Sequence, residues 1–447
     1  MTATLTKEDV LRRVTEDNVK FINLQFTDIH GMVKNVTIPV GQLEKSLTQG
    51  TWFDGSSIEG FTRIQESDQL LRPDPSTYAV IPWMDSEERS ARLICDIYMP
   101  DGKPFEGDPR YILKRALAKA KSMGYKYYTG PELEFFLFRK DNGHVEPLPH
   151  DRGSYFDLSL DNAYEVRQEM MMALEKFGIE VEASHHEVAA GQHEIDFKYD
   201  DALRTADNAV TLKATFKAIA QRHGLHITFM PKPIAGVNGS GMHVHQSLWD
   251  IKEDRNAFYD AKDPYRLSSV AKSFIAGQLS HIKEIAAVTN PLVNSYKRLV
   301  PGYEASTYIC WAQRNRTALI RIPKIIEGKG NAARAEIRCP DPASNPYLVF
   351  ALLLEAGLKG IRESAIPPEP AEEDVFEYTD EMLRKKGIDY LPYSLWQAIE
   401  KMSASELAKQ TLGEHTFGRY LAAKTQEWDA FRVSVTDWEK ERYLELY

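Results

Sequence analysis

The segment at residues 130–138, GPELEFFLF, constrains the fold most, because two glutamates stand one residue apart in an otherwise apolar run. In a helix, Glu132 and Glu134 would point about 200° apart. In a strand they share one face, with Leu133 and Phe135 on the other. The Gly-Pro start, the aromatic residues and the short length favour a strand. Either the strand lies at a sheet edge with its glutamates facing water, or both carboxylates line a site.

Composition narrows the function classes. The chain has 447 residues and a net charge of −10, which argues against a general nucleic-acid-binding surface. The polar N-terminus has no apolar core of a secretory signal, and no run of 18 apolar residues exists, so we expect no membrane span. Cys95, Cys310 and Cys339 are odd in number and far apart, which fits reduced thiols in the cytoplasm.

The order of predicted elements indicates an α+β fold. A β-rich unit is expected at about residues 15–100, with a hairpin turn at His30-Gly31, followed by a Pro- and Gly-rich linker at 99–110. The later strands come mostly in pairs, which favours a mainly antiparallel sheet over a doubly wound one. Helices are predicted at 5–18, 110–124, 161–177, 202–223, 265–289 and 346–362. Strands are predicted at 125–138, 179–188, 193–199, 225–230, 242–248 and 316–322. The tail, 393–447, is predicted helical, with Trp396, Trp428 and Trp438 as packing anchors.

Two further segments supply carboxylates and histidines. The first, VEASHHEVAAGQHEIDF at 181–197, predicts strand, loop, strand and carries Glu187 and Glu194. The second, KPIAGVNGSGMHVHQSL at 232–248, places His243 and His245 on one strand face after a glycine-rich turn. The spacing does not match a closed zinc site, and the number of carboxylates indicates harder ions. For any single histidine a purely structural role remains an equal alternative.

Arginines are concentrated in the next part of the chain. Arg334, Glu336 and Arg338 alternate along one predicted strand, and Arg316 and Arg321 precede them. Guanidinium groups that converge bind phosphates and carboxylates through two parallel hydrogen bonds. A solvated strand held together by salt bridges remains the alternative.

Electrostatics decides what a shared cavity would need. Two carboxylates 4 Å apart repel by about 1 kcal/mol in water and about 4 kcal/mol at an effective dielectric of 20. A cluster of five therefore needs cations, and oxygen ligands with one imidazole favour Mg²⁺ or Mn²⁺. Together with the arginines, such a cluster has the parts for phosphoryl transfer. Its members would be Glu132, Glu134, Glu187, Glu194 and Glu336.

Over essentially its full length the chain resembles bacterial glutamine synthetases of the class I type, in their short form. The matching motifs are WFDGSSIEGF (52–61), GPELEFFLF (130–138), ASHHEV (183–188), MPKP (230–233), NGSGMHVH (238–245), KRLVPGYEA (297–305), RNRTALIRIP (314–323) and RAEIRCPDPASNPYL (334–348). The resemblance implies an N-terminal β-grasp domain with its leading helix (1–103). It also implies a catalytic domain (104–447), with a mainly antiparallel curved sheet flanked by helices and a helical C-terminal region.

The resemblance implies an ATP-dependent ligase that joins ammonia to L-glutamate through γ-glutamyl phosphate, giving glutamine, ADP and phosphate. Two metal sites, for Mg²⁺ or Mn²⁺, are implied. Glu134, Glu187 and Glu194 match the ligands on the glutamate side, and Glu132, His243 and Glu336 match those on the ATP phosphates.

The remaining roles carried over from the family form four sets. Catalytic positions are Asp54, Glu304, Arg316 and Arg338, where Glu304 is the flap glutamate that helps deprotonate ammonium. Glutamate-binding positions are Asn238, Gly239, His243, Arg298, Glu304 and Arg338. ATP-binding positions are Glu182, His245, Ser247, Arg316, Arg321 and Arg334. Ammonium-binding positions are Asp54, Ser57, Tyr155 and Glu187, and Arg63 matches a residue linked to glutamine feedback.

Assembly and regulation are also implied by the resemblance. Class I enzymes form dodecamers of two hexameric rings, and Asp54 serves the active site of the neighbouring subunit. Phe376 stands at the position of the tyrosine that longer forms adenylylate, so we expect no adenylylation here. Short forms can bind a nitrogen-response transcription regulator through their C-terminus. Two alternatives are a γ-glutamyl ligase for a polyamine or other amine and a non-catalytic, ring-forming glutamine sensor, but Asp54 and Ser57 favour ammonia.

Overall fold

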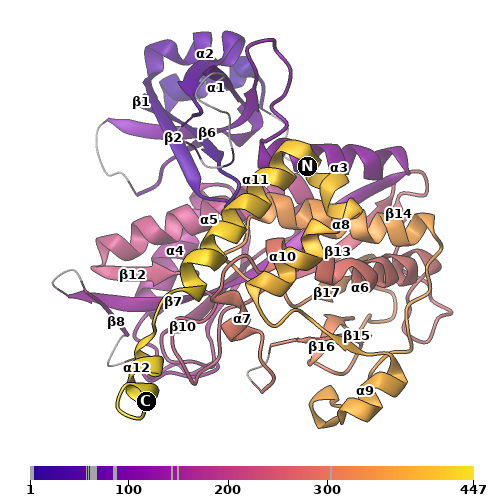
Figure 1. Ribbon diagram of the computed structural model, residues 1–447. Coiled ribbons are helices and arrows are strands. Elements are labelled where there is room, and N and C mark those ends of the chain that lie inside the picture. Colours follow the sequence, from indigo (N-terminus) through magenta and orange to yellow (C-terminus); the bar gives the residue numbers. More distant parts are fainter. Residues whose placement is uncertain are drawn as a thin grey trace.

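A computed structural model describes residues 5–56, 58, 60, 68–83, 88–141, 144–147, 151–302 and 305–447. The chain forms two β-sheets with separate cores, a smaller N-terminal one and a larger one covered by helices (Figure 1). This arrangement confirms the predicted α+β class. Ser57, Arg63 and Glu304 lie outside the described residues.

The smaller sheet belongs to the N-terminal part of the chain. Its order is β2-β1-β6-β4-β3, with β5 paired to β6. The predicted hairpin is present: β1 and β2 run antiparallel, and Gly31 in the turn has a φ of +78°, which glycine adopts without strain. The elements are α1 (Lys7–Glu16), β1 (Val19–Thr27), β2 (Val33–Pro39), α2 (Leu43–Gln49), β3 (Thr51–Asp54), β4 (Asp68–Pro73), β5 (Ala79–Val80) and β6 (Arg89–Tyr98).

The larger sheet has the main order β18-β15-β16-β17-β13-β7-β10-β9, and its described pairs are antiparallel except β15 with β16. β8, β11 and β12 also pair with β7, and β14 pairs with β13. The strands are β7 (Tyr125–Asp141), β8 (His144–Pro147), β9 (Val181–His186), β10 (Gln192–Phe197), β11 (Asp200–Asp201), β12 (Leu225–Thr228), β13 (Met242–Asp250), β14 (Arg255–Asn256), β15 (Tyr308–Ala312), β16 (Ala318–Arg321), β17 (Ala335–Ile337) and β18 (Asp389–Tyr390).

Strand β7 is the centre of this sheet. It pairs with β13 on one side and with β10 on the other. Leu133, Phe135 and Leu137 point into the main core and are at most 1% exposed, as the alternation predicted. The edge-strand alternative for residues 130–138 is therefore wrong, because both long sides of this segment are hydrogen-bonded to other strands.

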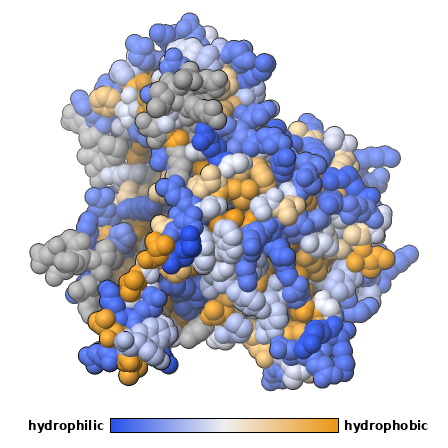
Figure 2. Space-filling model, in the orientation of Figure 1, coloured by the Kyte–Doolittle hydropathy of each residue, from blue (hydrophilic) through white to orange (hydrophobic). Residues whose placement is uncertain are grey.

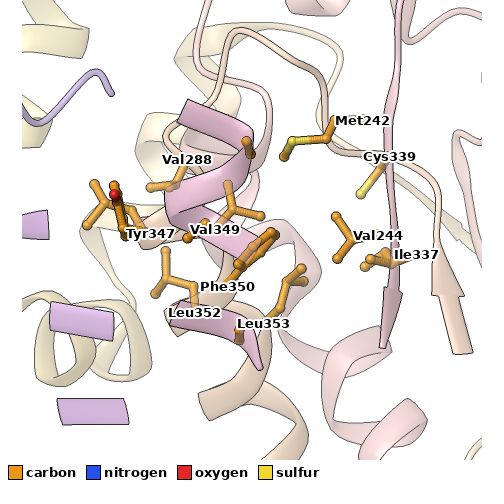
Figure 3. Packing of buried hydrophobic residues seen from close by; sticks show 14 of the residues in the cluster. Met242, Val244, Val288, Ile337, Cys339, Tyr347, Val349, Phe350, Leu352 and Leu353 are labelled. Atoms are coloured by element: carbon orange, nitrogen blue, oxygen red, sulfur yellow. The ribbon is translucent and has the colours of Figure 1, made fainter. Parts of the chain in front are cut away.

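Helices cover the apolar face of the sheet. Helix α8 is buried along almost its whole length because α3, α6 and the sheet pack around it. Figure 3 shows Phe350 of α8 on the side nearest Val244 and Ile337 of the sheet. The helices are α3 (Pro109–Ser122), α4 (Tyr164–Lys176), α5 (Ala202–Arg222), α6 (Ser269–Thr289), α7 (Ser295–Arg298), α8 (Pro346–Arg362), α9 (Asp380–Lys386), α10 (Leu395–Ser403), α11 (Glu406–Arg432) and α12 (Asp437–Tyr443).

The C-terminal region is helical as predicted, but two of its tryptophans do not anchor the chain. Trp428 packs against the main core, whereas Trp396 is 39% exposed and Trp438 is 59% exposed. Helix α12 contains no buried residue and extends from the body, and apolar side chains lie on the surface near this end of the chain (Figures 1 and 2). Among the described helices, none is both long and apolar enough to cross a membrane.

Glycines allow α6 and α8 to cross closely. A Cβ atom on Gly277 would lie 2.2 Å from the carbonyl oxygen of Ala356 and 2.8 Å from the nitrogen of Gly360. We therefore expect Gly277→Ala to destabilise the protein by about 1–3 kcal/mol through overpacking. Gly418→Ala in α11, where a Cβ would meet no atom within 4 Å, is the matched control and should not destabilise. Thermal unfolding of the two variants checks this; equal midpoints would contradict it.

Candidate active site

Strand register brings the predicted acidic residues to one sheet face. Glu134 on β7 lies opposite Glu194 on β10, and Glu194 lies opposite His185 on β9. Two residues earlier on β7, Glu132 lies opposite His243 on β13. Residues directly opposite each other in an antiparallel pair have Cβ atoms about 4.5–5.5 Å apart, so each pair is in reach of one ion.

The same face continues across β17 and β16. His245 on β13 lies opposite Glu336 on β17, and Glu336 lies opposite Arg321 on β16. Arg321 Nη1 donates to Glu336 Oε2 at 2.8 Å, and Arg338 Nη1 donates to the other oxygen of the same carboxylate. Glu336 is 1% exposed, so it is a buried anion that two guanidinium groups neutralise in this arrangement.

The first compact group of possible metal ligands is Glu132, His245 and Glu336, whose ligand atoms all lie within 4.8 Å of one another. His245 Nε2 lies 2.7 Å from Glu132 Oε1. His243, which the resemblance places in this set, is also close: its Nδ1 lies 3.4 Å from Glu132 Oε2 and 4.0 Å from Glu336 Oε1. The structure therefore adds His245 to the neighbourhood that sequence reasoning assigned to Glu132, His243 and Glu336.

The second compact group is His185, Glu187 and Glu194, again with ligand atoms within 4.8 Å. His185 Nε2 lies 2.8 Å from Glu187 Oε1 and 3.9 Å from Glu194 Oε1. Glu134, the third ligand implied by the resemblance, lies beside Glu194 through the register of β7 and β10. Sequence reasoning missed His185 as a group member, although the motif ASHHEV contained the signal.

Glu134 is held in place by neutral donors. Its Oε2 accepts hydrogen bonds from the backbone nitrogen of Gly241 and from Gln192 Nε2, both at 3.0 Å. Burial raises the pKa of Glu134 to about 8, and the charge of Glu187 adds to this rise. Burial also raises the pKa of Glu194 well above its usual value, with a contribution from Asp196.

The other half of the cluster is anionic. Burial alone would raise the pKa of Glu132, but hydrogen bonds from His243 and His245 outweigh it and lower that pKa well below its usual value. Burial alone would raise the pKa of Glu336, but the charges of Arg338, His245 and His243 lower it below its usual value. Glu134 and Glu194 are therefore shifted toward the protonated form, whereas histidine and arginine partners favour the anionic forms of Glu132 and Glu336.

The donor set fits divalent cations that prefer oxygen. Carboxylates predominate, each group includes an imidazole, and the described residues around them contribute no thiolate. Mg²⁺ and Mn²⁺ take such ligands, and either would relieve the repulsion between Glu134, Glu187 and Glu194 that contributes to the raised pKa of Glu134 and Glu194.

A third group, Asp151, His186 and His193, has metal-like spacing but the wrong proton positions. Arg167 Nη1 lies 3.0 Å from His193 Nδ1, and a guanidinium can only donate, so the proton of the neutral ring is on Nε2. His186 faces an acceptor at each nitrogen: the carbonyl of Glu187 at 2.6 Å and Asp151 Oδ1 at 3.0 Å. Both rings therefore have a proton on the nitrogen that faces Asp151. His186 donates to it, whereas His193 Nε2 lies 3.6 Å from Asp151 Oδ2 and makes no hydrogen bond.

A cavity of about 660 Å³ adjoins the first group and has the size of a ligand pocket. Glu132 is one of its lining residues, and Arg334 Nε donates to His245 Nδ1 at 3.2 Å. Four of the six predicted ATP-binding residues line it, namely Glu182, His245, Ser247 and Arg334. Arg321 instead contacts Glu336, and Arg316 is exposed after β15. Sequence reasoning missed the aromatic and loop residues of the lining, among them Tyr128, Phe197, Tyr199, Lys329 and Asn331.

The glycine-rich turn at 238–241 is built for close approach. A Cβ on Gly239 would lie 2.3 Å from the carbonyl of Pro231, and one on Gly241 would lie 2.5 Å from Arg298 Nη2. Arg298 is buried and donates to the carbonyls of Cys339 at 2.9 Å and Arg338 at 3.2 Å. The turn that carries Asn238 and Gly239 is thus fixed between Arg298 and the backbone that carries Arg338.

The described members of the predicted ammonium site come from both parts of the chain, with Tyr155 and Glu187 in the larger part and Asp54 on the smaller sheet. The ring of Tyr155 lies 5.6 Å from that of His185, which contacts Glu187. Asp54 ends β3, the last strand of the smaller sheet, where its side chain is exposed and accepts from the backbone of Ser56 at 2.8 Å. Within the described part of the chain, no residue of the smaller sheet lines the cavity or joins the two acidic groups.

This fold and site define a class: an enzyme with clustered carboxylates for divalent cations beside a nucleotide-sized cavity. The β-Grasp domain family of glutamine synthetase matches residues 18–100, and the catalytic domain family of glutamine synthetase matches residues 106–443. Curated relatives include glutamine synthetases of Clostridium saccharobutylicum, 56% identical over 447 residues and 100% of both chains, and of Thermus thermophilus, 52% identical over 99% of both. A solved GmaS chain in complex with ADP is 32% identical, with a TM-score of 0.89 over 98% of this chain and 99% of that one.

These matches extend over nearly the whole chain and over both sheets. The chain belongs to the glutamine synthetase family, and its relatives identify it as a class I glutamine synthetase.

The shifted pKa of Glu134 predicts a pH dependence for the metal-free protein. With a pKa of about 8, folded Glu134 holds a proton that the unfolded chain releases near pH 4.5, so stability from this group is lost as the pH rises toward 8. Glu134→Gln should therefore stabilise the protein in EDTA by on the order of 2 kcal/mol at pH 8 and much less at pH 5.

Thermal unfolding at both pH values measures this difference. The control is Glu355→Gln, which breaks the ion pair of a buried carboxylate with Lys119 and should destabilise at both pH values. A Glu134→Gln effect that does not grow between pH 5 and pH 8 would refute the assignment.

Proposed function

We propose that this glutamine synthetase makes glutamine from L-glutamate and ammonia in two steps on one sheet face. ATP phosphorylates the side-chain carboxylate of glutamate, and ammonia then displaces phosphate from γ-glutamyl phosphate. The observation that supports this most directly is the pair of carboxylate groups on β7 and its neighbours, beside a cavity of nucleotide size.

Mg²⁺ or Mn²⁺ held by these carboxylates would neutralise phosphate charge and orient the transferred group. On the nucleotide side we assign Glu132, His243 and Glu336 as ligands. Both nitrogens of His245 already have protein partners, Arg334 and Glu132, so His245 orients Glu132 while His243 keeps a nitrogen for an ion. On the glutamate side we assign Glu134, Glu187 and Glu194, with His185 next to them.

Arginines complete the phosphate chemistry in this proposal. When a cation replaces them at Glu336, Arg321 and Arg338 are free to turn toward phosphate oxygens, with Arg334 at the cavity wall and Arg316 from the loop after β15. Asn238, Gly239 and Arg298 position glutamate, because the turn and the guanidinium are mutually fixed.

The second step needs an ammonium pocket. We assign Tyr155 and Glu187 of one subunit, Asp54 and Ser57 of its neighbour, and Glu304 as the group that helps deprotonate ammonium. The exposed position of Asp54 at the edge of the smaller sheet suits a role across a subunit boundary. The full assembly is then a dodecamer of two hexameric rings, built from chains with domains at 1–103 and 104–447.

Regulation follows the short form in this proposal. The enzyme works in the cytoplasm, glutamine feedback acts through Arg63, and the C-terminal region is the contact for a nitrogen-response regulator. Phe376 packs against Tyr308 with ring centroids 5.7 Å apart and has no hydroxyl, which excludes adenylylation at this position.

A second candidate function keeps the phosphoryl chemistry and changes the amine, so that a polyamine or other amine is the acceptor. The likeness to GmaS, with a TM-score of 0.89, is the observation that favours it. Asp54 favours ammonia, since a carboxylate in the pocket binds small cationic ammonium.

One assay tests both functions. Purified protein with ATP, Mg²⁺ and glutamate is expected to form glutamine from ammonium, with a higher kcat/KM than for methylamine or a polyamine in parallel reactions. No glutamine would refute the proposed function. A higher kcat/KM for another amine would establish the second candidate in its place.

Shared active sites predict complementation between inactive variants. Asp54→Ala and Glu187→Gln each disable one side of the pocket, so each assembly alone should be inactive at low ammonium. Subunits of the two variants mixed by co-expression should recover about a quarter of the wild-type activity, because one site in four combines two intact halves. Mass spectrometry confirms that the assemblies contain both variants. If such assemblies recover no activity, Asp54 and Glu187 do not complete one site from two different chains.

A further inference from the structure

The segment at 151–157 connects two parts of the proposed site. It carries Tyr155 and packs against the hairpin of β9 and β10, which carries Glu187 and Glu194. The backbone nitrogen of Phe156 donates to the carbonyl of His186 at 3.3 Å, and Ser154 Oγ donates to the carbonyl of Val188 at 3.2 Å. These bonds hold the segment along the turn of the hairpin.

A buried hydrogen-bonded pair lies under this contact. His186 Nε2 donates to Asp151 Oδ1 at 3.0 Å, and the side chains of both residues are completely buried. The other ring nitrogen of His186 donates to the backbone carbonyl of Glu187 at 2.6 Å. Through these two contacts the ring joins Asp151 to the peptide of Glu187.

The neighbouring histidine is supported from the opposite side. His193 precedes Glu194, and its ring lies 4.7 Å from that of His186. Arg167 on α4 donates to His193 Nδ1 at 3.0 Å and forms two bonds to Asp161, at 2.9 and 2.6 Å. His193 Nε2 then faces Asp151 Oδ2 at 3.6 Å. The residues next to both Glu187 and Glu194 therefore meet at one carboxylate, that of Asp151.

We propose that Asp151 and His186 are positioning residues that lock the segment carrying Tyr155 to the hairpin carrying Glu187 and Glu194. The inference rests on the proposed function for the identity of the amine and the ion. Through this pair, the cation site on the glutamate side and the amine pocket share one rigid support. The nucleotide cavity contacts the same hairpin only at the end away from this turn, through Glu182 and Ala183 of β9 and Asp196 and Phe197 of β10.

The physical reason is the penalty for a buried polar group whose hydrogen bond is lost. Loss of the Asp151 carboxylate weakens the hydrogen bond of the buried His186 ring, so the neighbouring backbone shifts to find water or another partner. Groups that orient metal ligands commonly change metal affinity by 10–100-fold when they are mutated. A shift of Glu187 would alter its carboxylate at the cation site and, in the same movement, the space beside Tyr155.

The test compares Asp151→Asn with wild type in the full-length assembly. Mn²⁺ binding, measured by calorimetry without nucleotide, is expected to weaken by about 10–100-fold at one class of site. The KM for ammonium should rise at least about tenfold, while the KM for ATP stays within about twofold. A variant that is merely less stable would lose active protein without this split between substrates.

A milder variant keeps all charges. A Cβ on Gly153 would lie 2.8 Å from His186 Nε2, so Gly153→Ala should displace the ring and produce the same split to a smaller extent, even if Asp151→Asn does not fold. Gly41→Ala, where a Cβ meets no atom within 4 Å, is the control and should leave both values unchanged.

Unchanged Mn²⁺ affinity and ammonium KM in a folded Asp151→Asn or Gly153→Ala protein would overturn the proposal, as would equal rises in both KM values. If the wild-type enzyme forms no glutamine, the function fails. The Mn²⁺ comparison still tests the positioning role, because it needs no turnover.

Discussion

Repulsion between carboxylates is the constraint on which this structure depends. Glu132, Glu134, Glu194 and Glu336 are brought to one sheet face by backbone register, and Glu187 follows directly after β9. In the absence of cations, protons, imidazoles and guanidinium groups relieve the repulsion unequally, so that some of these groups have raised and others lowered pKa values. The fold therefore places the carboxylates in position for divalent cations before any ion binds, and their mutual repulsion lowers the stability of the folded state.

Apolar burial on the opposite face of the same strands offsets this loss of stability. Leu133 and Phe135 alternate with the glutamates and are fully buried, and α3 and α5 pack against this strand. Successive side chains of a strand point to opposite faces of the sheet. Burial of an apolar residue in the core therefore also fixes the face to which the neighbouring carboxylate points. A slip by one residue would exchange the core for the site, so stability and function select the same register.

The candidate metal ligands are held in place by other side chains behind them. The side chains that face the ions are supported by a second set that does not, including Gln192 for Glu134, His245 for Glu132 and the Asp151–His186 pair for the hairpin turn. In the proposed assembly, Asp54 at the exposed edge of the smaller sheet would complete the amine side of a neighbouring subunit.

The sequence by itself determined the α+β class, the alternation on β7 and the identity of the acidic residues, because these depend on local periodicity and on side-chain chemistry. Only the tertiary structure decided that β7 is central, that His185 and His245 join the acidic groups, and that Asp151 meets His186 and His193. It also decided that Trp438 is exposed, against the prediction. Such outcomes depend on strand order and on packing between segments far apart in the chain, and local periodicity contains no information about which strands become neighbours.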